Sequence, residues 1–370
     1  MSGSGPDAIV IGAGIVGAAV ADALAGDGHR VLVLEAAAAA SGATAAGMGH
    51  LVAMDDSPAQ LALTAFSLRC WRELLPALPR HCEHEPAGTL WVAAAGTSPG
   101  VLEEKRARYE AAGLEAEILD SHQVAAAEPH LAPGLAGGLR VPGDGVVYAP
   151  AVTRYLLERA RGRGCEVREG APVETIGPGS VRCGGSRLTA NVIVNAAGAG
   201  AAALTTSLPI MPRKGHLAVT DRAPGFCRHQ IVELGYLASA HDLHAASVAF
   251  NVQPRATGQL LIGSSRELVG WDASLNRPLA ARMLRRAVTF MPALAHLPVT
   301  RTWTGFRPAT PDGLPLIGRW EAIDGLWIAA GHEGLGITTA LGTARILADA
   351  IAGRTAAIDP RPYAPARAHA

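Results

Sequence analysis

The most constraining feature of this chain is a glycine-rich segment near its start, Val10-Ile11-Gly12-Ala13-Gly14-Ile15-Val16-Gly17. A short apolar run precedes it and an alanine-rich run follows, which predicts a strand over 7–11, a helix over 15–25 and a second strand over 30–34. In such a turn the first glycine permits the tight bend, the second lets phosphates approach the backbone, and the third lets helix and strand pack closely. The chain is therefore predicted to begin with a doubly wound dinucleotide-binding unit.

The second predicted strand ends at an acidic residue, Glu35. A carboxylate at this point can accept a hydrogen bond from a ribose 2′-hydroxyl and disfavours a 2′-phosphate, so NADP is an unfavourable ligand. The phosphates are expected at the positive helix N-terminus. The glycine motif alone does not separate FAD from NAD. The dinucleotide contacts predicted from this unit are Gly12, Ala13, Gly14, Ile15, Val16, Gly17, Glu35 and Ala36.

Two further segments favour FAD. The segment 41–48 is small and hydroxyl-bearing, so it could donate hydrogen bonds to the pyrophosphate and flavin, or it could be a flexible surface loop. The segment 331–338 opens the last predicted helix, whose positive end would face the flavin edge that becomes negative on reduction. An NAD enzyme needs no second glycine-rich helix start. The predicted flavin contacts are Ser41, Gly42, Ala46, Gly47, Met48, Gly331, His332, Glu333, Gly334, Leu335, Gly336, Ile337 and Thr338.

The middle of the chain has a different pattern. Strand-like stretches at 217–220, 247–253 and 260–263 follow one another without intervening helices, which predicts an antiparallel sheet. The expected fold class is α/β, with an FAD-binding Rossmann-like (doubly wound) domain and an inserted α+β substrate domain built on that antiparallel sheet. The predicted FAD domain comprises 1–85, 145–215 and 301–370, and the predicted substrate domain comprises 86–144 and 216–300.

Composition excludes several function classes. The 32 Lys and Arg residues balance 32 Asp and Glu, which is unlike a nucleic-acid binder. No apolar run has the length of a membrane span, and the first apolar run lacks the basic flank of a signal peptide, so we expect a cytoplasmic protein. The five cysteines are scattered, which predicts neither a disulfide framework nor a metal site. Asp55 and Asp56 are expected to form a solvated turn.

Taken together, these segments resemble the D-amino acid oxidase family of flavoproteins, which includes glycine oxidase and the sarcosine oxidase subunits. The resemblance covers nearly the whole chain and is strongest at 7–35, 41–48, 194–198, 305–318 and 326–338. It implies that Arg307, in Gly305-Phe306-Arg307-Pro308, binds the substrate carboxylate, for which a planar guanidinium is well suited. The alternative is a salt-bridged or surface arginine. It also implies FAD contacts at Val173, Ala197 and Gly198.

Two positions depart from the family pattern. His332 stands where some sarcosine oxidases attach FAD through cysteine, so non-covalent FAD is expected. Asn251 stands where glycine oxidase has a carboxylate-binding tyrosine, which predicts a different substrate geometry. His50 and His332 are candidates for contact with flavin or substrate, and a structural role is the alternative for each histidine.

Within the family, 48–57 and 331–339 resemble the β-subunit of D-hydroxyproline dehydrogenase. This implies hydride transfer from the α-carbon to flavin, oxidation of a C–N bond, and cis-4-hydroxy-D-proline as the best single substrate. It also implies a larger flavoprotein subunit and an iron–sulfur carrier as partners. The alternatives are an oxygen-dependent oxidase of glycine, sarcosine or another D-amino acid, a flavin-carrying assembly subunit without a substrate site, and an NAD-linked dehydrogenase. Arg307 favours catalysis over the assembly role, and the second glycine-rich segment disfavours NAD.

Overall fold

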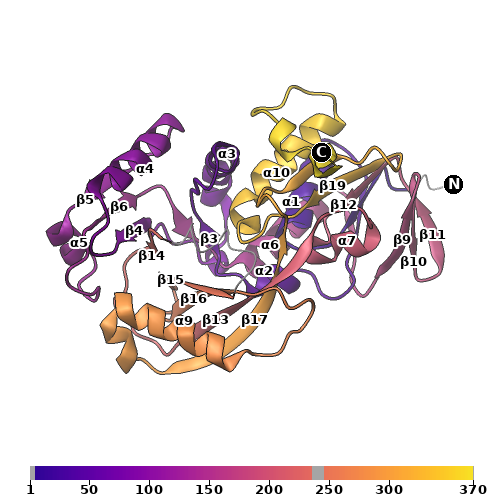
Figure 1. Ribbon diagram of the computed structural model, residues 1–370. Coiled ribbons are helices and arrows are strands. Elements are labelled where there is room, and N and C mark those ends of the chain that lie inside the picture. The colour runs from indigo at the N-terminus through magenta and orange to yellow at the C-terminus, as the bar shows by residue number, and fades with distance from the viewer. Residues whose placement is uncertain (1–4, 236–245, 370) are drawn as a thin grey trace.

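A computed structural model describes residues 5–235 and 246–369 of the chain. Its first region, to the right in Figure 1, is built on a six-stranded sheet in the order β18-β19-β12-β1-β2-β8. All neighbours in this sheet are parallel except β18 and β19. The strands are β1 (Ala8–Ile11), β2 (Val31–Leu34), β8 (Glu166–Arg168), β12 (Val192–Asn195), β18 (Leu316–Arg319) and β19 (Leu326–Ala330).

This sheet is covered on both faces, as its continuously apolar central strands require. Ala8 and Val10 of β1 face a core shared with the helices, whereas Ile9 and Ile11 face a second core that includes Val181. The helical layer contains α1 (Ile15–Gly26), α3 (Pro58–Leu74), α6 (Ala149–Arg161) and α10 (Gly336–Ile351). The opposite layer contains β9 (Val173–Gly177), β10 (Ser180–Cys183) and β11 (Ser186–Thr189), which form an antiparallel sheet.

The second region is built on an eight-stranded sheet in the order β17-β13-β16-β15-β14-β4-β6-β5. Its neighbours are antiparallel except β4 and β14, so the predicted antiparallel sheet contains one parallel pair. The strands are β4 (Thr89–Ala93), β5 (Glu117–Leu119), β6 (Gly137–Val141), β13 (Met211–Thr220), β14 (Gln230–Glu233), β15 (Ser247–Pro254), β16 (Leu260–Arg266) and β17 (Val299–Ala309).

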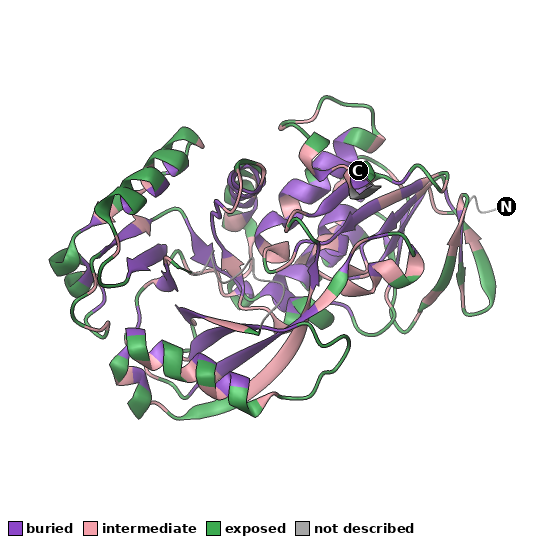
Figure 2. Ribbon diagram, in the orientation of Figure 1, coloured by how far each residue is buried: buried purple, intermediate pink, exposed green. Residues whose placement is uncertain are grey.

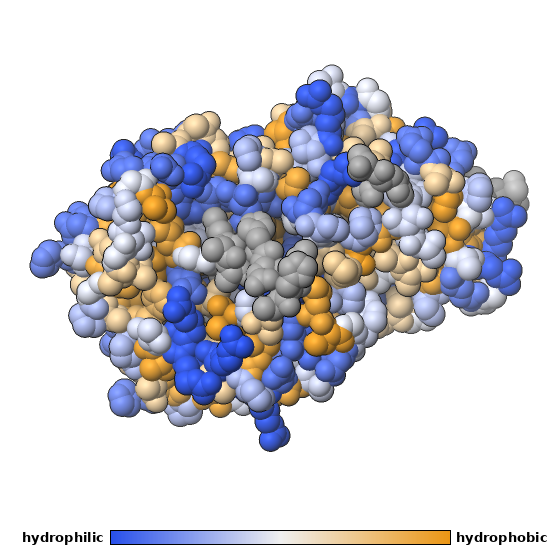
Figure 3. Space-filling view, viewed as in Figure 1, coloured by the Kyte–Doolittle hydropathy of each residue, from blue (hydrophilic) through white to orange (hydrophobic). Residues whose placement is uncertain are grey.

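Helices flank this second sheet, and their outer faces are exposed (Figure 2). They are α4 (Pro99–Ala111), α5 (Ser121–Ala127) and α9 (Arg277–Phe290). The remaining elements are α2 (Gly42–Ala46), α7 (Ala201–Leu204) and the two-stranded pair of β3 (His50–Leu51) and β7 (Gly145–Val146). On the face shown in Figure 3, hydrophobic and hydrophilic residues are interspersed.

The predicted fold class is confirmed, and the structure extends several predicted elements. The strand predicted over 217–220 begins earlier, at Met211. The prediction missed its first part because Arg213, Lys214 and His216, which are buried, interrupt the apolar pattern of the sequence. The predicted domain boundaries at 215/216 and 300/301 fall inside β13 and β17, which pair along their length in the eight-stranded sheet. The domain division stays a prediction, and 1–4, 236–245 and 370 lie outside the described residues.

The 17-residue helix α3 is absent from the elements predicted above. Its start carries a recognisable signal, because the Ser57 side chain accepts a hydrogen bond from the Gln60 amide and Pro58 occupies the first turn.

Candidate functional site

The glycine turn between β1 and α1 is closely packed. Gly12 has φ +101°, and a Cβ there would lie 2.7 Å from the Ala196 carbonyl oxygen at the end of β12. A Cβ on Gly17 would lie 1.9 Å from the Gly12 carbonyl oxygen. Larger residues at either position would collide with backbone. The two glycines therefore hold α1 against the strands with its N-terminus at the carboxyl ends of β1 and β12, where doubly wound folds bind ligands.

The N-terminus of α1 has no side-chain cap of its own. Instead, the Thr44 hydroxyl of α2 accepts a hydrogen bond of 3.0 Å from the Ile15 amide. Thr44 is buried, so this hydroxyl lies between the helix terminus and the segment 41–48. A helix terminus of this kind, with a hydroxyl beside it, suits a pyrophosphate. The sequence prediction did not include Thr44, although it is a hydroxyl within the segment already singled out.

Glu35 faces the same turn from the end of β2. Its Oε2 accepts a hydrogen bond of 2.7 Å from the Ala13 amide, and its Oε1 accepts one of 2.9 Å from the Ala37 amide. A carboxylate has about four acceptor positions, so both oxygens retain capacity for ribose hydroxyls. The Ala171 amide donates to the Glu35 carbonyl over 2.8 Å, which brings the start of β9, including Val173, towards this end of the site. These residues fit the adenosine and pyrophosphate of FAD.

The two other predicted cofactor segments meet in space. A Cβ on Gly47 would lie 3.1 Å from Cδ1 of Ile337, at the start of α10. The Thr338 hydroxyl donates to the His50 carbonyl over 2.9 Å and accepts from the Val52 amide over 3.2 Å. Residues nearly 290 positions apart are thus fixed to each other, and α10 also begins without a side-chain cap. Both segments were predicted to contact the flavin, and that contact stays a prediction.

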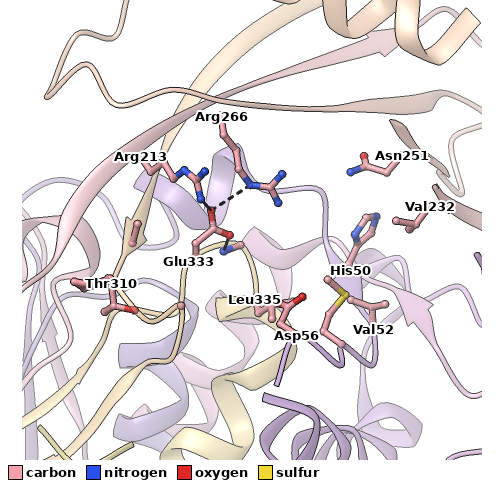
Figure 4. Close-up of a pocket in the computed structure, with 15 residues that line it drawn as sticks. His50, Val52, Asp56, Arg213, Val232, Asn251, Arg266, Thr310, Glu333 and Leu335 are labelled. Carbon is pink, nitrogen blue, oxygen red and sulfur yellow. Dashed lines mark hydrogen bonds and ion pairs between the residues drawn. The ribbon is translucent and has the colours of Figure 1, made fainter. Parts of the chain in front are cut away.

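A cavity of about 850 Å³, measured with its open mouth, adjoins the start of α10. Strands of the eight-stranded sheet contribute Arg213, Asn251 and Arg266, and Glu333 and Leu335 come from the segment that precedes α10 (Figure 4). Val52, Met54 and Asp56 line one side, where every second residue of an extended segment faces the cavity. The remaining lining residues are His50, Arg213, Val232, Asn251, Arg266, Ala309, Thr310, Pro311, Gly313, Glu333, Gly334 and Leu335.

Three arginines surround one carboxylate at the cavity wall. Oε1 of Glu333 lies 3.6 Å from Nε of Arg266, 3.7 Å from Nη1 of Arg213 and 4.0 Å from Nε of Arg307. Oε2 of Glu333 accepts from the Gly334 amide at 2.5 Å. Burial alone raises the pKa of Glu333, but Arg266, Arg307 and Arg213 together lower it below its ordinary value. Glu333 is therefore ionised, and the cluster contains one carboxylate and three guanidinium groups.

The structure distinguishes the arginines by their access to the cavity. Arg307, the predicted substrate ligand, does not line it. Its Nη1 donates to the Ser265 carbonyl over 3.0 Å, and a Cβ on Gly215 would lie 2.2 Å from the same nitrogen. Contact between Arg307 and substrate stays a prediction. Arg213 and Arg266, which the sequence prediction missed, line the cavity and are almost fully buried. The available signal was a charged residue at the end of a strand-like stretch, after Leu260–Gly263 for Arg266 and before Leu217–Thr220 for Arg213.

The two predicted histidines have different surroundings. His50 lines the cavity, burial lowers its pKa to about 4, and its Nε2 has no hydrogen-bond partner among the described residues. His332 does not line the cavity. Its Nε2 lies 3.0 Å from the Thr343 hydroxyl of α10, and burial lowers its pKa to about 3. This geometry favours the structural alternative for His332, whereas His50 is a neutral ring available to a ligand.

Asn251 lines the cavity as well, on β15. Its Nδ2 donates to the Ser264 hydroxyl over 3.5 Å, and its Oδ1 has no hydrogen-bond partner within the described part of the chain. Its predicted role in substrate binding stays a prediction.

The expected solvated turn at Asp55 and Asp56 is wrong. Asp55 is buried and paired with Lys105 and Arg108 of α4, and Asp56 lines the cavity. The turn is buried because α4 packs behind it, a long-range contact that local polarity does not reveal.

No group of three or more potential metal ligands occurs among the residues that the structure describes, and all five cysteines are unpaired. In 5–235 and 246–369, no helix combines the length and apolar character needed to cross a bilayer.

The fold and site define an FAD-dependent oxidoreductase of the class that acts on amino donors. The chain belongs to the FAD dependent oxidoreductase (DAO) family, whose model matches residues 7–350. FAD is the cofactor of this family, and the residues around Gly12, Glu35 and Thr44 fit it.

Individual relatives span different parts of the chain. It is 29% identical over 377 residues to glycine oxidase of Geobacillus kaustophilus, which covers 96% of each chain. It is 34% identical to D-amino acid dehydrogenase of Xanthobacter autotrophicus, over 70% of this chain and 60% of that one. The crystal structure of the Geobacillus glycine oxidase superposes with TM-score 0.84 at 27% identity, covering 97% of this chain and 98% of that one. L-proline dehydrogenase from P. horikoshii shares the fold, with TM-score 0.87 at 21% identity and 98% coverage of both chains.

Proposed function

We propose that this chain oxidises the C–N bond of a secondary D-amino acid of proline type, with cis-4-hydroxy-D-proline the best single substrate. The observation that carries the amino acid assignment is the arginine cluster around Glu333 at the wall of the cavity. A buried carboxylate of a substrate needs a partner, and guanidinium groups bind carboxylates in bidentate fashion. The assignment of a ring-shaped substrate with D stereochemistry comes from the resemblance to the D-hydroxyproline dehydrogenase β-subunit.

The rest of the cavity supports a ring-shaped substrate. Val52, Met54 and Val232 offer an apolar wall for ring methylenes. His50 Nε2 and Asn251 Oδ1 are buried acceptors that can receive hydrogen bonds from a substrate amine or hydroxyl.

The roles of the residues follow from these positions. FAD, when bound, accepts the hydride from the substrate α-carbon, which is the chemistry of the cofactor itself. The arginine cluster fixes the carboxylate, with Arg307 the member indicated by family resemblance. His50, neutral at physiological pH, can accept a hydrogen bond from a substrate N–H or O–H group. The apolar wall of the cavity excludes water from the substrate ring.

A second candidate is an oxygen-dependent glycine oxidase. The similarity to the Geobacillus enzyme across 96% of both chains favours it. Asn251 in place of the expected tyrosine favours a different substrate, as do the apolar cavity residues.

The proposal also includes a cytoplasmic location and electron transfer to a partner, namely a larger flavoprotein subunit and an iron–sulfur carrier. The five scattered cysteines leave the iron–sulfur group to another chain.

The test is anaerobic reduction of the purified yellow protein by cis-4-hydroxy-D-proline, D-proline, L-proline, sarcosine and glycine. We expect rapid bleaching of the flavin band with the two D-imino acids. Arg307→Ala should keep its flavin and lose most of the reduction, whereas the conservative Arg307→Lys should be impaired less.

Faster reduction by glycine or sarcosine would replace the substrate assignment with the oxidase alternative. No reduction by any amino acid would support the assembly-subunit alternative. Purification from the native host should show co-eluting chains. A single-chain enzyme that turns over rapidly with oxygen would contradict the proposed partners.

A further inference from the structure

We infer that Tyr109 and Lys105 of α4 are positioning residues that set one wall of the cavity, and thereby its selection of ligands that carry a ring. Neither side chain lines the cavity. Both act through the segment 52–56, here called the wall segment, whose alternate residues do line it. The inference rests on the proposed function for the identity of the ligand, an amino acid with a ring.

The wall segment follows β3 but has no partner strand of its own. β3 pairs with β7 over two residues, and the regular pairing ends there. In the described part of the chain, side chains take the place of a partner strand. They are the Thr338 hydroxyl on the Val52 amide (3.2 Å), Oδ1 of Asp144 on the Ala53 amide (3.2 Å) and the Thr64 hydroxyl on the Met54 amide (3.3 Å). The position of this wall therefore depends on individual side chains and not on a sheet ladder.

α4 holds the wall segment from the side away from the cavity. The Tyr109 hydroxyl donates to the Ala53 carbonyl over 2.8 Å. Lys105 forms a buried ion pair with Asp55, and Arg108 donates to the other carboxylate oxygen of Asp55 over 2.9 Å. Side chains alternate in direction along an extended segment. Contacts that hold residues 53 and 55 from behind therefore direct their neighbours into the cavity.

The buried face of α4 is polar where it meets the wall segment. Its buried residues are Leu102, Lys105 and Tyr109, and the last two are those that bond the segment. The Lys105 ammonium also lies 3.9 Å from the centre of the Trp91 ring and 4.8 Å from that of Tyr109. Desolvation largely offsets the attraction within a buried ion pair, so apolar residues would serve packing at least as well. What the polar residues add is a fixed position for the wall.

The wall segment lies across the cavity from the charges that suit a carboxylate. In Figure 4, Val52 and Asp56 are on one side, whereas Arg213 and Arg266 are on the other. Val52 and Met54 offer apolar surface to the part of a ligand that carries no charge. A displaced wall segment should therefore change the fit of a ring and leave a ligand that is only a carboxylate unaffected.

The experiment compares two ligands of the FAD-containing protein, each measured by the change in flavin absorption. Pyrrole-2-carboxylate keeps the ring and carboxylate of proline but has no hydrogen to give up at the α-carbon, and acetate is a carboxylate without a ring. Tyr109→Phe removes one oxygen atom and leaves the buried Ala53 carbonyl without its donor. The Kd of pyrrole-2-carboxylate should rise roughly 10-fold, while that of acetate changes by less than about twofold.

Further variants separate positioning from general loss of stability, which would weaken both ligands alike or lower the flavin content. Lys105→Met keeps the side-chain length but leaves Asp55 with Arg108 alone, so it should act as Tyr109→Phe does. Lys105→Arg retains the charge and should recover part of the loss. Tyr155→Phe, on α6, is the matched control and should leave both Kd values unchanged. Near-ultraviolet circular dichroism shows which variants are folded, and either Tyr109→Phe or Lys105→Met is sufficient to decide.

Equal changes in the two Kd values, or an unchanged Kd of pyrrole-2-carboxylate in a folded variant, overturn the inference. So does a wild type that binds pyrrole-2-carboxylate no more tightly than acetate, because the wall then contributes nothing to a ring. Failure of the proposed function gives a different result. If no amino acid reduces the flavin while only the ring ligand responds to Tyr109→Phe, the positioning role stands without the reaction. If amino acids reduce the flavin but both ligands respond alike, the reaction stands without this role.

Discussion

Asp144→Asn should stabilise the protein at neutral and alkaline pH. Asp144 is buried immediately before β7, and its Oδ2 accepts from the Thr89 hydroxyl over 2.6 Å while its Oδ1 accepts from the Ala53 amide over 3.2 Å. Burial raises its pKa to about 7, although Thr89, Ala53 and nearby cations oppose that effect. Asparagine reproduces the protonated acid, because its oxygen can accept from Ala53 while its amide donates to the Thr89 hydroxyl.

The sign follows from proton binding. Between the ordinary pKa of 3.8 and about 7, the folded state holds a proton that the unfolded state has released, so stability falls as pH rises through this window. At about 1.4 kcal/mol per unit of pKa, the difference corresponds to about 4 kcal/mol as an upper limit. The free energy of unfolding of Asp144→Asn should therefore match the wild type near pH 4 and exceed it by up to about 4 kcal/mol at pH 8.

Urea unfolding of both proteins with excess FAD, at a series of pH values, gives this difference directly. Subtraction is needed because His50 and His332, whose pKa values are lowered by burial, act in the opposite direction and lose stability as pH falls below about 6.5. Both proteins share those contributions. Asp324→Asn, at a side chain that is 84% exposed, controls for the removal of a carboxylate in general. A difference between Asp144→Asn and wild type that does not change with pH would refute the reasoning.

Three further predictions concern the cofactor. We expect FAD to be held without a covalent bond, so acid precipitation should release the yellow colour into the supernatant, and colour in the pellet would show a covalent link. Glu35→Ala should weaken FAD binding by ~1.5–3 kcal/mol in titrations of apoprotein, and an unchanged affinity would remove Glu35 from the ribose site. Gly17→Ala should abolish FAD retention during purification, because its Cβ would lie 1.9 Å from the Gly12 carbonyl oxygen. Gly100→Ala is the control: it lies at an exposed position of α4, where a Cβ meets nothing closer than 3.8 Å, and this variant should purify as a yellow protein.

Local sequence was sufficient for the nucleotide end of the molecule. The strand, turn, helix and following strand over 7–35 are contiguous, and the positive φ of Gly12 is a requirement of the turn itself. A Cβ on Gly17 would collide with Gly12, and Glu35 accepts a hydrogen bond from Ala13, so part of the motif is constrained by its own residues. The close approaches at Gly12 and Gly14 involve Ala196 and Thr44, which lie outside it.

Tertiary structure decided the substrate end. Arg213, Arg266 and Arg307 come from strands that are far apart in sequence, and only the order β17-β13-β16 places them around Glu333. Sequence reasoning identified Arg307 by resemblance, but which guanidinium groups face the cavity depends on sheet register, which a single sequence does not specify. Asp55 was misjudged for the same reason, since the partner that makes its burial tolerable, Lys105, lies on a helix about 50 residues later. Charges that are buried with distant partners can be located only after the chain has folded, whereas the order of strand, glycine turn, helix and strand can be read from contiguous residues.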